Sequence, residues 1–180
     1  MSYKGVIIEC VREVFHGLKA DKQSVSHNDM YRGLCSMIEW TRQFKRQPGA
    51  IQLSKVMSDM EWAKEYSTVK FGLPRQSGHT GMISRLLDLG RMNGGGENPF
   101  LERAVVMFPN VDMAIAAEFS PGWSWVGTAN MKSRDKFRGQ VVKAVVVDAA
   151  PVLSKKETNK IYRMFAEMSK DPEFVFVFLG

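Results

Sequence analysis

Apolar residues recur at helical spacing in the first half of the chain and at strand spacing in the second. Up to about residue 95 they return every three to four positions, which is typical of amphipathic helices. After about residue 104 they alternate with polar residues or form continuous runs, as in strands. The pattern predicts an α+β protein with a helical region over residues 1–95, a sheet region over 98–180 and a joint at 93–96, where the sequence is Asn-Gly-Gly-Gly.

The helical region divides at polar and proline-containing segments. Ser26 and Asp29 have the spacing of a weak capping box at the start of a helix, and Gln47-Pro48-Gly49 ends that helix. A capping box at Ser58 and Glu61 falls inside a further helical stretch, so that stretch is either one long helix or two short ones. Helices are therefore expected over residues 3–20, 26 to about 46, 53–66 and 80–92.

The sheet region predicts the order strand, strand, strand, helix, strand. Strands are expected over residues 111–119, 123–126, 140–148 and 174–179, and a capping box at Ser154 and Glu157 begins the helix. Ser120-Pro121-Gly122 indicates a turn between antiparallel strands. The last strand is wholly apolar, so we expect it inside an antiparallel or mixed sheet and not at its edge. The helical half is expected to pack alongside this sheet.

Composition excludes several classes of protein. The 180 residues include 44% hydrophobic and 24% charged residues, which are ordinary globular values. Two cysteines are too few for a disulfide scaffold, and three histidines without ligand spacing predict no metal and no cofactor. No apolar run approaches the length of a membrane span, and no signal sequence is recognisable, so a cytoplasmic, reducing setting is expected.

A stripe of alternating cations is the most informative segment. Lys132, Arg134, Lys136 and Arg138 would share one face of an extended strand or hairpin arm, about 6–7 Å apart, which is commensurate with successive phosphates. Just upstream, Trp123 and Trp125 would offer rings on which unpaired bases stack. These six residues predict a site for single-stranded DNA or RNA. The alternative is a solubilised edge strand with core tryptophans.

Other clusters carry weaker signals. Basic residues gather at Arg42, Lys45 and Arg46 and again over 155–163, at Lys155, Lys156, Lys160 and Arg163; either group is also explained as a solvated helix surface or helix end. The loop 70–81 contains His79 beside Ser77 and Thr80 and could receive an anion, but it lacks a Gly-x-x-x-x-Gly-Lys-Thr sequence.

A cluster of acids gives the least favoured reading. Asp112 and Glu118 would share a strand face near Asp148, as a metal-dependent nuclease requires. Solvent-facing acids explain the same residues equally well.

The net charge of +6 is compatible with a polyanionic partner. We therefore expect a small, basic, non-enzymatic protein that binds nucleic acid as an accessory or regulatory factor. The alternative is a protein-interaction or assembly subunit, or an inhibitor, of the kind carried by phages, which would bind a protein partner or form a homo-oligomer without binding nucleic acid. Measuring oligomeric state and oligonucleotide affinity discriminates between the two.

Overall fold

The computed structural model describes residues 27–72, 81–83, 104–116, 125–131, 137 and 141–180. The chain divides into two compact units, Met1–Ser36 and Met37–Gly180, and the sheet belongs to the second. The glycine-rich joint expected at residues 93–96 lies outside the described residues and stays a prediction.

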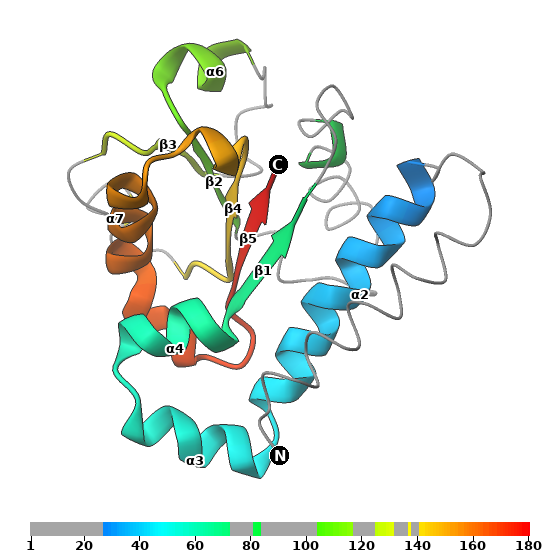
Figure 1. Ribbon diagram of the computed structural model, residues 1–180, viewed down its shortest axis with the longest axis vertical. Helices are drawn as coiled ribbons and strands as arrows, with labels where there is room; N and C mark the ends of the chain where they lie inside the picture. The colour runs from blue at the N-terminus through cyan, green and yellow to red at the C-terminus, as the bar shows by residue number, and fades with distance from the viewer. Residues whose placement is uncertain (1–26, 73–80, 84–103, 117–124, 132–136, 138–140) are drawn as a thin grey trace. The chain divides into compact units, whose positions relative to one another are not determined.

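In the part of the second unit that the structure describes, five parallel strands form a sheet. They lie in the order β1-β5-β4-β2-β3, and each neighbouring pair is parallel. The prediction of an antiparallel or mixed sheet is therefore wrong. The described part of the chain has an α/β architecture (Figure 1). The strands are β1 (Thr68–Phe71), β2 (Ala104–Phe108), β3 (Trp125–Thr128), β4 (Ala144–Val147) and β5 (Val175–Leu179).

Burial explains why these strands pair in parallel. Every residue of β2, β4 and β5 is buried. Parallel sheets are covered on both faces, and their strands are continuous apolar runs instead of alternating ones. Strands do form within the predicted runs 140–148 and 174–179, although β4 is shorter than the first run, and β5 is an interior strand between β1 and β4 as expected. Strands β1 and β2 were missed.

Residues 111–119 do not form the predicted strand. Val111–Ala116 is a helix, α6, and residues 117–119 lie outside the described part. The side-chain oxygen of Asn110 accepts the backbone N–H of Met113 at 2.9 Å, as an N-cap residue does. Alanines at alternate positions gave the sequence a strand-like period, although alanine favours helices. A helix therefore lies between β2 and β3, which is incompatible with the expected tight turn and antiparallel pair.

Among the described residues, three helices precede the sheet in sequence: α2 (His27–Lys45), α3 (Pro48–Val56) and α4 (Asp59–Tyr66). The stop expected after α2 is confirmed, and Pro48 then starts α3 because its fixed φ suits the first helical turn. Ser58 caps α4 with Glu61 in a complete capping box. Two short helices, and not one, therefore occupy the predicted stretch 53–66.

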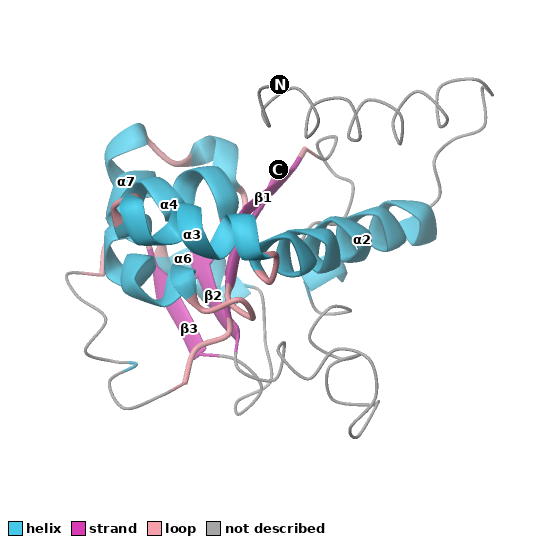
Figure 2. Ribbon diagram, turned by 90° about the horizontal axis from the view of Figure 1, so that it is seen from below, coloured by secondary structure: helices cyan, strands magenta, loops and turns pink. Residues whose placement is uncertain are grey.

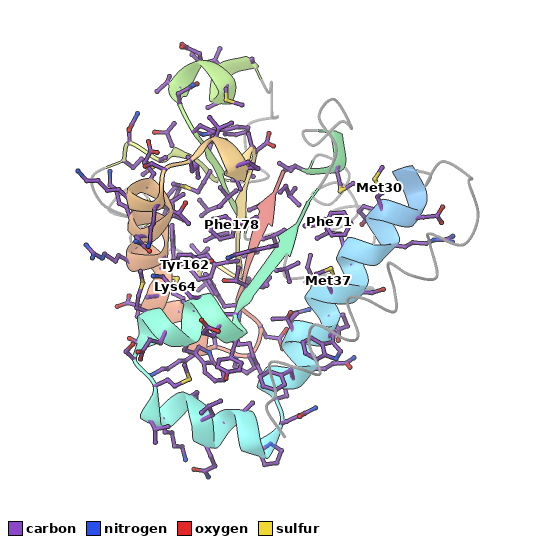
Figure 3. The ribbon with its side chains drawn as sticks, viewed as in Figure 1. Met30, Met37, Lys64, Phe71, Tyr162 and Phe178 are labelled. Carbon is purple, nitrogen blue, oxygen red and sulfur yellow. The ribbon has the colours of Figure 1, made fainter. Side chains whose placement is uncertain are left out.

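Helices α4 and α7 cover one face of the sheet (Figures 1 and 2). Helix α7 (Lys155–Phe165) follows the short η3 (Ala150–Val152), begins at the predicted Ser154 capping box and continues into η4 (Ala166–Lys170). Its buried residues are Ile161, Tyr162 and Phe165. The Tyr162 ring lies 4.9 Å from that of Phe176 and 5.2 Å from that of Phe178 (Figure 3).

Candidate ligand site at the carboxyl edge of the sheet

The strand order creates a switch point between β2 and β4. From β2 the chain moves outward to β3, and then crosses back to place β4 on the opposite side of β2. In open parallel sheets, ligands bind outside the carboxyl ends of the strands where the order reverses in this way. The arrowheads of β1 and β5 in Figure 1 point to this edge, and α6 follows β2 there.

Asp148 directly follows the buried strand β4 and therefore lies at this edge. The residue is 3% exposed, and its backbone N–H donates to the carbonyl of Met107 at 3.0 Å, which ties the ends of β4 and β2 together. One carboxylate oxygen accepts the backbone N–H of Ala149 at 2.8 Å. The carboxylate is therefore held in a fixed place at the switch point.

Ala149 adopts a conformation that alanine rarely takes. Its φ of 49° and ψ of 41° are left-handed, and among the described residues other than glycine it alone has a positive φ. Such a conformation costs on the order of 1–2 kcal/mol and concentrates at functional sites. Here it turns the chain directly after Asp148 into η3.

Glycines follow the neighbouring strands β5 and β1 at the same edge of the sheet. Gly180, which follows β5, donates its N–H to the carbonyl of Phe71 at 3.1 Å. Its φ of 137° suits only glycine, and a Cβ there would lie 2.3 Å from Cδ of Pro151. Gly72, which follows β1, faces Gly180 across the ladder, and a Cβ at Gly72 would meet only the carbonyl oxygen of Gly180, at 3.8 Å. Because Gly72 and Gly180 have no side chains, neither residue covers the backbone at the ends of β1 and β5.

The loop around His79 leaves β1 at this edge. Gly72 ends the described part of this segment, residues 73–80 lie outside it, and residues 81–83 are helical. Met82 and Ile83 are fully buried. The predicted anion-receiving loop, including Ser77, His79 and Thr80, is thus flanked by a parallel strand and a helix.

The predicted nucleic-acid stripe is not described. Lys132, Arg134, Lys136, Arg138 and Trp123 all lie outside the described residues. Phe137, within the stripe, is 3% exposed, and its ring lies 6.0 Å from that of Phe165. Trp125 begins β3 and pairs with Val105 in a parallel ladder. The stripe and the two tryptophans stay a prediction, although Trp125 does not belong to the antiparallel pair expected for it.

The basic cluster at the end of α2 has a structural role. Arg42 and Arg46 both pair with Glu173, and Lys45 donates to the carbonyls of Asp171 and Phe174. In the α7 cluster, Lys155, Lys156 and Arg163 are exposed, whereas Lys160 donates to the carbonyl of Ala129 at 3.3 Å. The two clusters therefore differ: the first is occupied by internal contacts, and the second largely faces solvent.

The acidic set is not brought together on one strand. Asp112 is exposed on α6, Asp148 is buried at the end of β4 and Glu118 is not described. Residues 111–116 form a helix and not the strand that was expected to align Asp112 with Glu118. The nuclease hypothesis depended on that alignment and therefore loses its support. In the described ranges, no group of three or more His, Cys, Asp or Glu residues could hold a metal ion. The sequence analysis identified Asp148 but grouped it with Asp112 and Glu118 in an acidic cluster, and not with the carboxyl ends of the strands.

Comparison with known proteins adds no assignment: no family model, no curated protein and no solved structure matches this chain. None of the helices in the described ranges combines the length and apolarity needed to cross a membrane.

Proposed function

We propose that this protein binds a nucleotide at the carboxyl edge of its parallel sheet. The observation that carries this proposal is Asp148, a carboxylate held at the switch point by β4 and followed by the left-handed Ala149. A parallel α/β sheet takes its ligands at this edge. A strained residue next to a buried acid there supports a functional role and not a purely structural one.

The chemistry of Asp148 favours a ligand that arrives with a divalent cation. Magnesium is bound in proteins through one or two carboxylates together with substrate phosphates and water, and it does not need a cage of several acids. A single fixed carboxylate therefore fits a magnesium–nucleotide complex better than a free metal ion. This preference agrees with the absence of an acidic cluster from the described residues.

The sequence that follows β1 supplies groups that suit phosphate. Residues 73–80 read Leu-Pro-Arg-Gln-Ser-Gly-His-Thr, and they stand between a parallel strand and a helix. Phosphate-binding loops of the form Gly-x-x-x-x-Gly-Lys-Ser/Thr occur in this strand–loop–helix context. The segment retains Gly78 and Thr80 at the corresponding spacing but has Leu73 for the first glycine and His79 for the lysine.

Nucleotide binding is tested by titrating the full chain with a fluorescent ATP analogue, with and without magnesium. The proposal expects saturable, magnesium-dependent binding that Asp148→Asn weakens at least tenfold. Asn keeps the oxygen that accepts the Ala149 N–H but loses the charge that attracts magnesium. Asp112→Asn is the matched control, since it removes an exposed carboxylate near the same edge and should bind as the wild type does. Undetectable binding at millimolar nucleotide, or equal binding by Asp148→Asn, would overturn the proposal.

Nucleic-acid binding is a second candidate, favoured by one contact. Lys160 reaches the carbonyl of Ala129, so α7, with the exposed Lys155, Lys156 and Arg163, lies against the segment that leads into the basic stripe. Helix α7 is thus in contact with Ala129, three residues before the predicted stripe, and we propose that a polyanion bound to the stripe also contacts α7. A protein-interaction role without nucleic-acid binding stays the alternative prediction.

Fluorescence anisotropy with a labelled single-stranded oligonucleotide tests the second candidate. Binding at low salt should weaken steeply as salt rises, because each neutralised phosphate releases counterions. Arg134→Glu with Lys136→Glu should abolish it, whereas Lys55→Glu with Lys64→Glu, an equal change of charge on α3 and α4, should not. Salt-independent binding, or an equal loss in both double variants, would contradict a specific role for the stripe. A defined oligomer with no affinity for nucleic acid would favour the protein-interaction alternative.

A further inference from the structure

The end of α2 is attached to the segment before β5 through a buried lysine. Lys45 is 3% exposed, and its ammonium nitrogen donates to the carbonyl of Asp171 at 2.5 Å and to that of Phe174 at 2.7 Å. These two carbonyls belong to the segment between η4 and β5. We call the surrounding cluster of charged groups the α2–β5 junction; its members are Arg42, Lys45, Arg46, Lys143, Asp171 and Glu173.

Cations outnumber carboxylates in the α2–β5 junction. Glu173 is shared by Arg42 and Arg46, and a carboxylate oxygen of Glu39 lies 3.6 Å from the Arg42 guanidinium. Asp171 already pairs with Lys143 at 2.8 Å, while its other carboxylate oxygen accepts the backbone N–H of Glu173. Lys45 consequently has the backbone carbonyls of Asp171 and Phe174 as its hydrogen-bond partners.

This environment disfavours the charged form of Lys45. Burial is the main cause, attraction to Asp171 opposes it, and repulsion from Arg42 and Lys143 adds to it, so that the pKa of Lys45 falls from 10.5 to about 7. When the junction opens and water reaches the amine, the pKa returns toward its ordinary value. Opening is therefore coupled to uptake of a proton.

We propose that the α2–β5 junction is a pH-responsive clamp, in which protonation of Lys45 favours release of the end of α2 from the segment that precedes β5. A lysine that binds a proton more weakly in the closed form than in the open form stabilises the closed form as the pH rises. This gain accumulates between about pH 7 and about pH 10.5 and is absent below that window, where both forms are protonated. Acidification toward neutral pH therefore loosens the clamp.

The clamp is tested on the full chain by two NMR measurements. In a spectrum of labelled lysine side chains, one lysine should titrate with a midpoint near pH 7, and Lys45→Met should remove that transition. Lys143→Met should raise the midpoint, because a repelling cation is lost and Asp171 is released, whereas Asp171→Asn should lower it. Lys64→Met, which removes an exposed lysine of α4, is the matched control and should leave the transition unchanged (Figure 3).

Backbone amide exchange at Phe174 and Val175 then reports opening. After correction for the intrinsic pH dependence of exchange, opening should be about 20-fold more frequent at pH 6.5 than at pH 8.5, as linkage gives for these two pKa values. In Lys45→Met this ratio should fall to one. If Lys45→Met does not fold, the opposite shifts from Lys143→Met and Asp171→Asn still decide the question. The absence of any lysine titrating below pH 9, or a 20-fold ratio that persists in Lys45→Met, would overturn the proposal.

Discussion

Trp62 of α4 donates its indole N–H to the backbone carbonyl of Ser169, 3.0 Å away in η4. Ser67 donates its hydroxyl to the same oxygen at 2.6 Å. One carbonyl thus joins the helix that covers the sheet, the residue before β1 and the turn that leads toward β5. Trp62 is 1% exposed, so this bond is shielded from water.

Replacing Trp62 with phenylalanine should destabilise the protein by about 1–2 kcal/mol, because it removes a buried hydrogen bond and leaves part of the indole volume empty. The cost is limited because Ser67 still satisfies the carbonyl. Urea unfolding measures the difference. Trp40→Phe is the control, since Trp40 is exposed and should change stability by less than about 0.5 kcal/mol. Equal effects of the two substitutions would contradict the role given to the Trp62 bond.

Replacing Ala149 with glycine should stabilise the protein. Glycine adopts the left-handed conformation without steric cost, and this gain exceeds the entropy that glycine adds to the unfolded chain, leaving about 0.5–1 kcal/mol. Ala150→Gly, one residue later in η3, should instead destabilise, because that position has no left-handed geometry to relieve. Thermal unfolding of both variants measures the contrast, and a lower Tm for Ala149→Gly would show that the alanine is not strained.

The contribution of the α7 capping box to the stability of the fold should depend on pH. Hydrogen bonds from the side chain and then the backbone of Ser154 lower the pKa of Glu157 below 4.5. A carboxyl group with a lowered pKa stabilises the fold above its ordinary pKa and loses that contribution as the pH falls through the folded value. Ser154→Ala should therefore be more destabilising at pH 7 than at pH 3.

At pH 7 the loss from Ser154→Ala should be about 1 kcal/mol, as for other N-cap residues. Denaturant unfolding at the two pH values measures it. Ser58→Ala removes the equivalent capping box of α4 and should behave in the same way, because the pKa of Glu61 is lowered by the same contacts. A loss that is identical at pH 3 and pH 7 in both variants would exclude the carboxylate contribution.

Local signals in the sequence predicted local structure well. Ser58 with Glu61, and Ser154 with Glu157, identified helix starts because an N-cap acts within four residues. The apolar runs that became β4 and β5 were identified because burial on both faces leaves no polar alternation. What could not be predicted was the pairing of strands, which depends on residues far apart in the chain.

The mispredicted elements depend on contacts that are not visible in the local sequence pattern. Thr68–Phe71 is a strand because β5, about a hundred residues later in the chain, lies beside it, and four residues alone carry too little pattern to show this. Val111–Ala116 had a strand-like period, but the cap from Asn110 and the alanine content favoured a helix. Asp148 was visible as an acid after an apolar run; its position at a switch point follows only from the order of the strands.

The place of β5 between β1 and β4 constrains the order of assembly during synthesis. In the described sheet, β1 contacts the other strands only through β5. While the ribosome is still making residues 144–174, β1 has already been synthesised but β5, the strand that pairs with it, has not. Until then the backbone of β1 is either exposed to water or bound by a chaperone. Contacts between such distant segments also slow folding in general. A released chain truncated before residue 175 should therefore be far more sensitive to protease at Thr68–Phe71 than the full chain is.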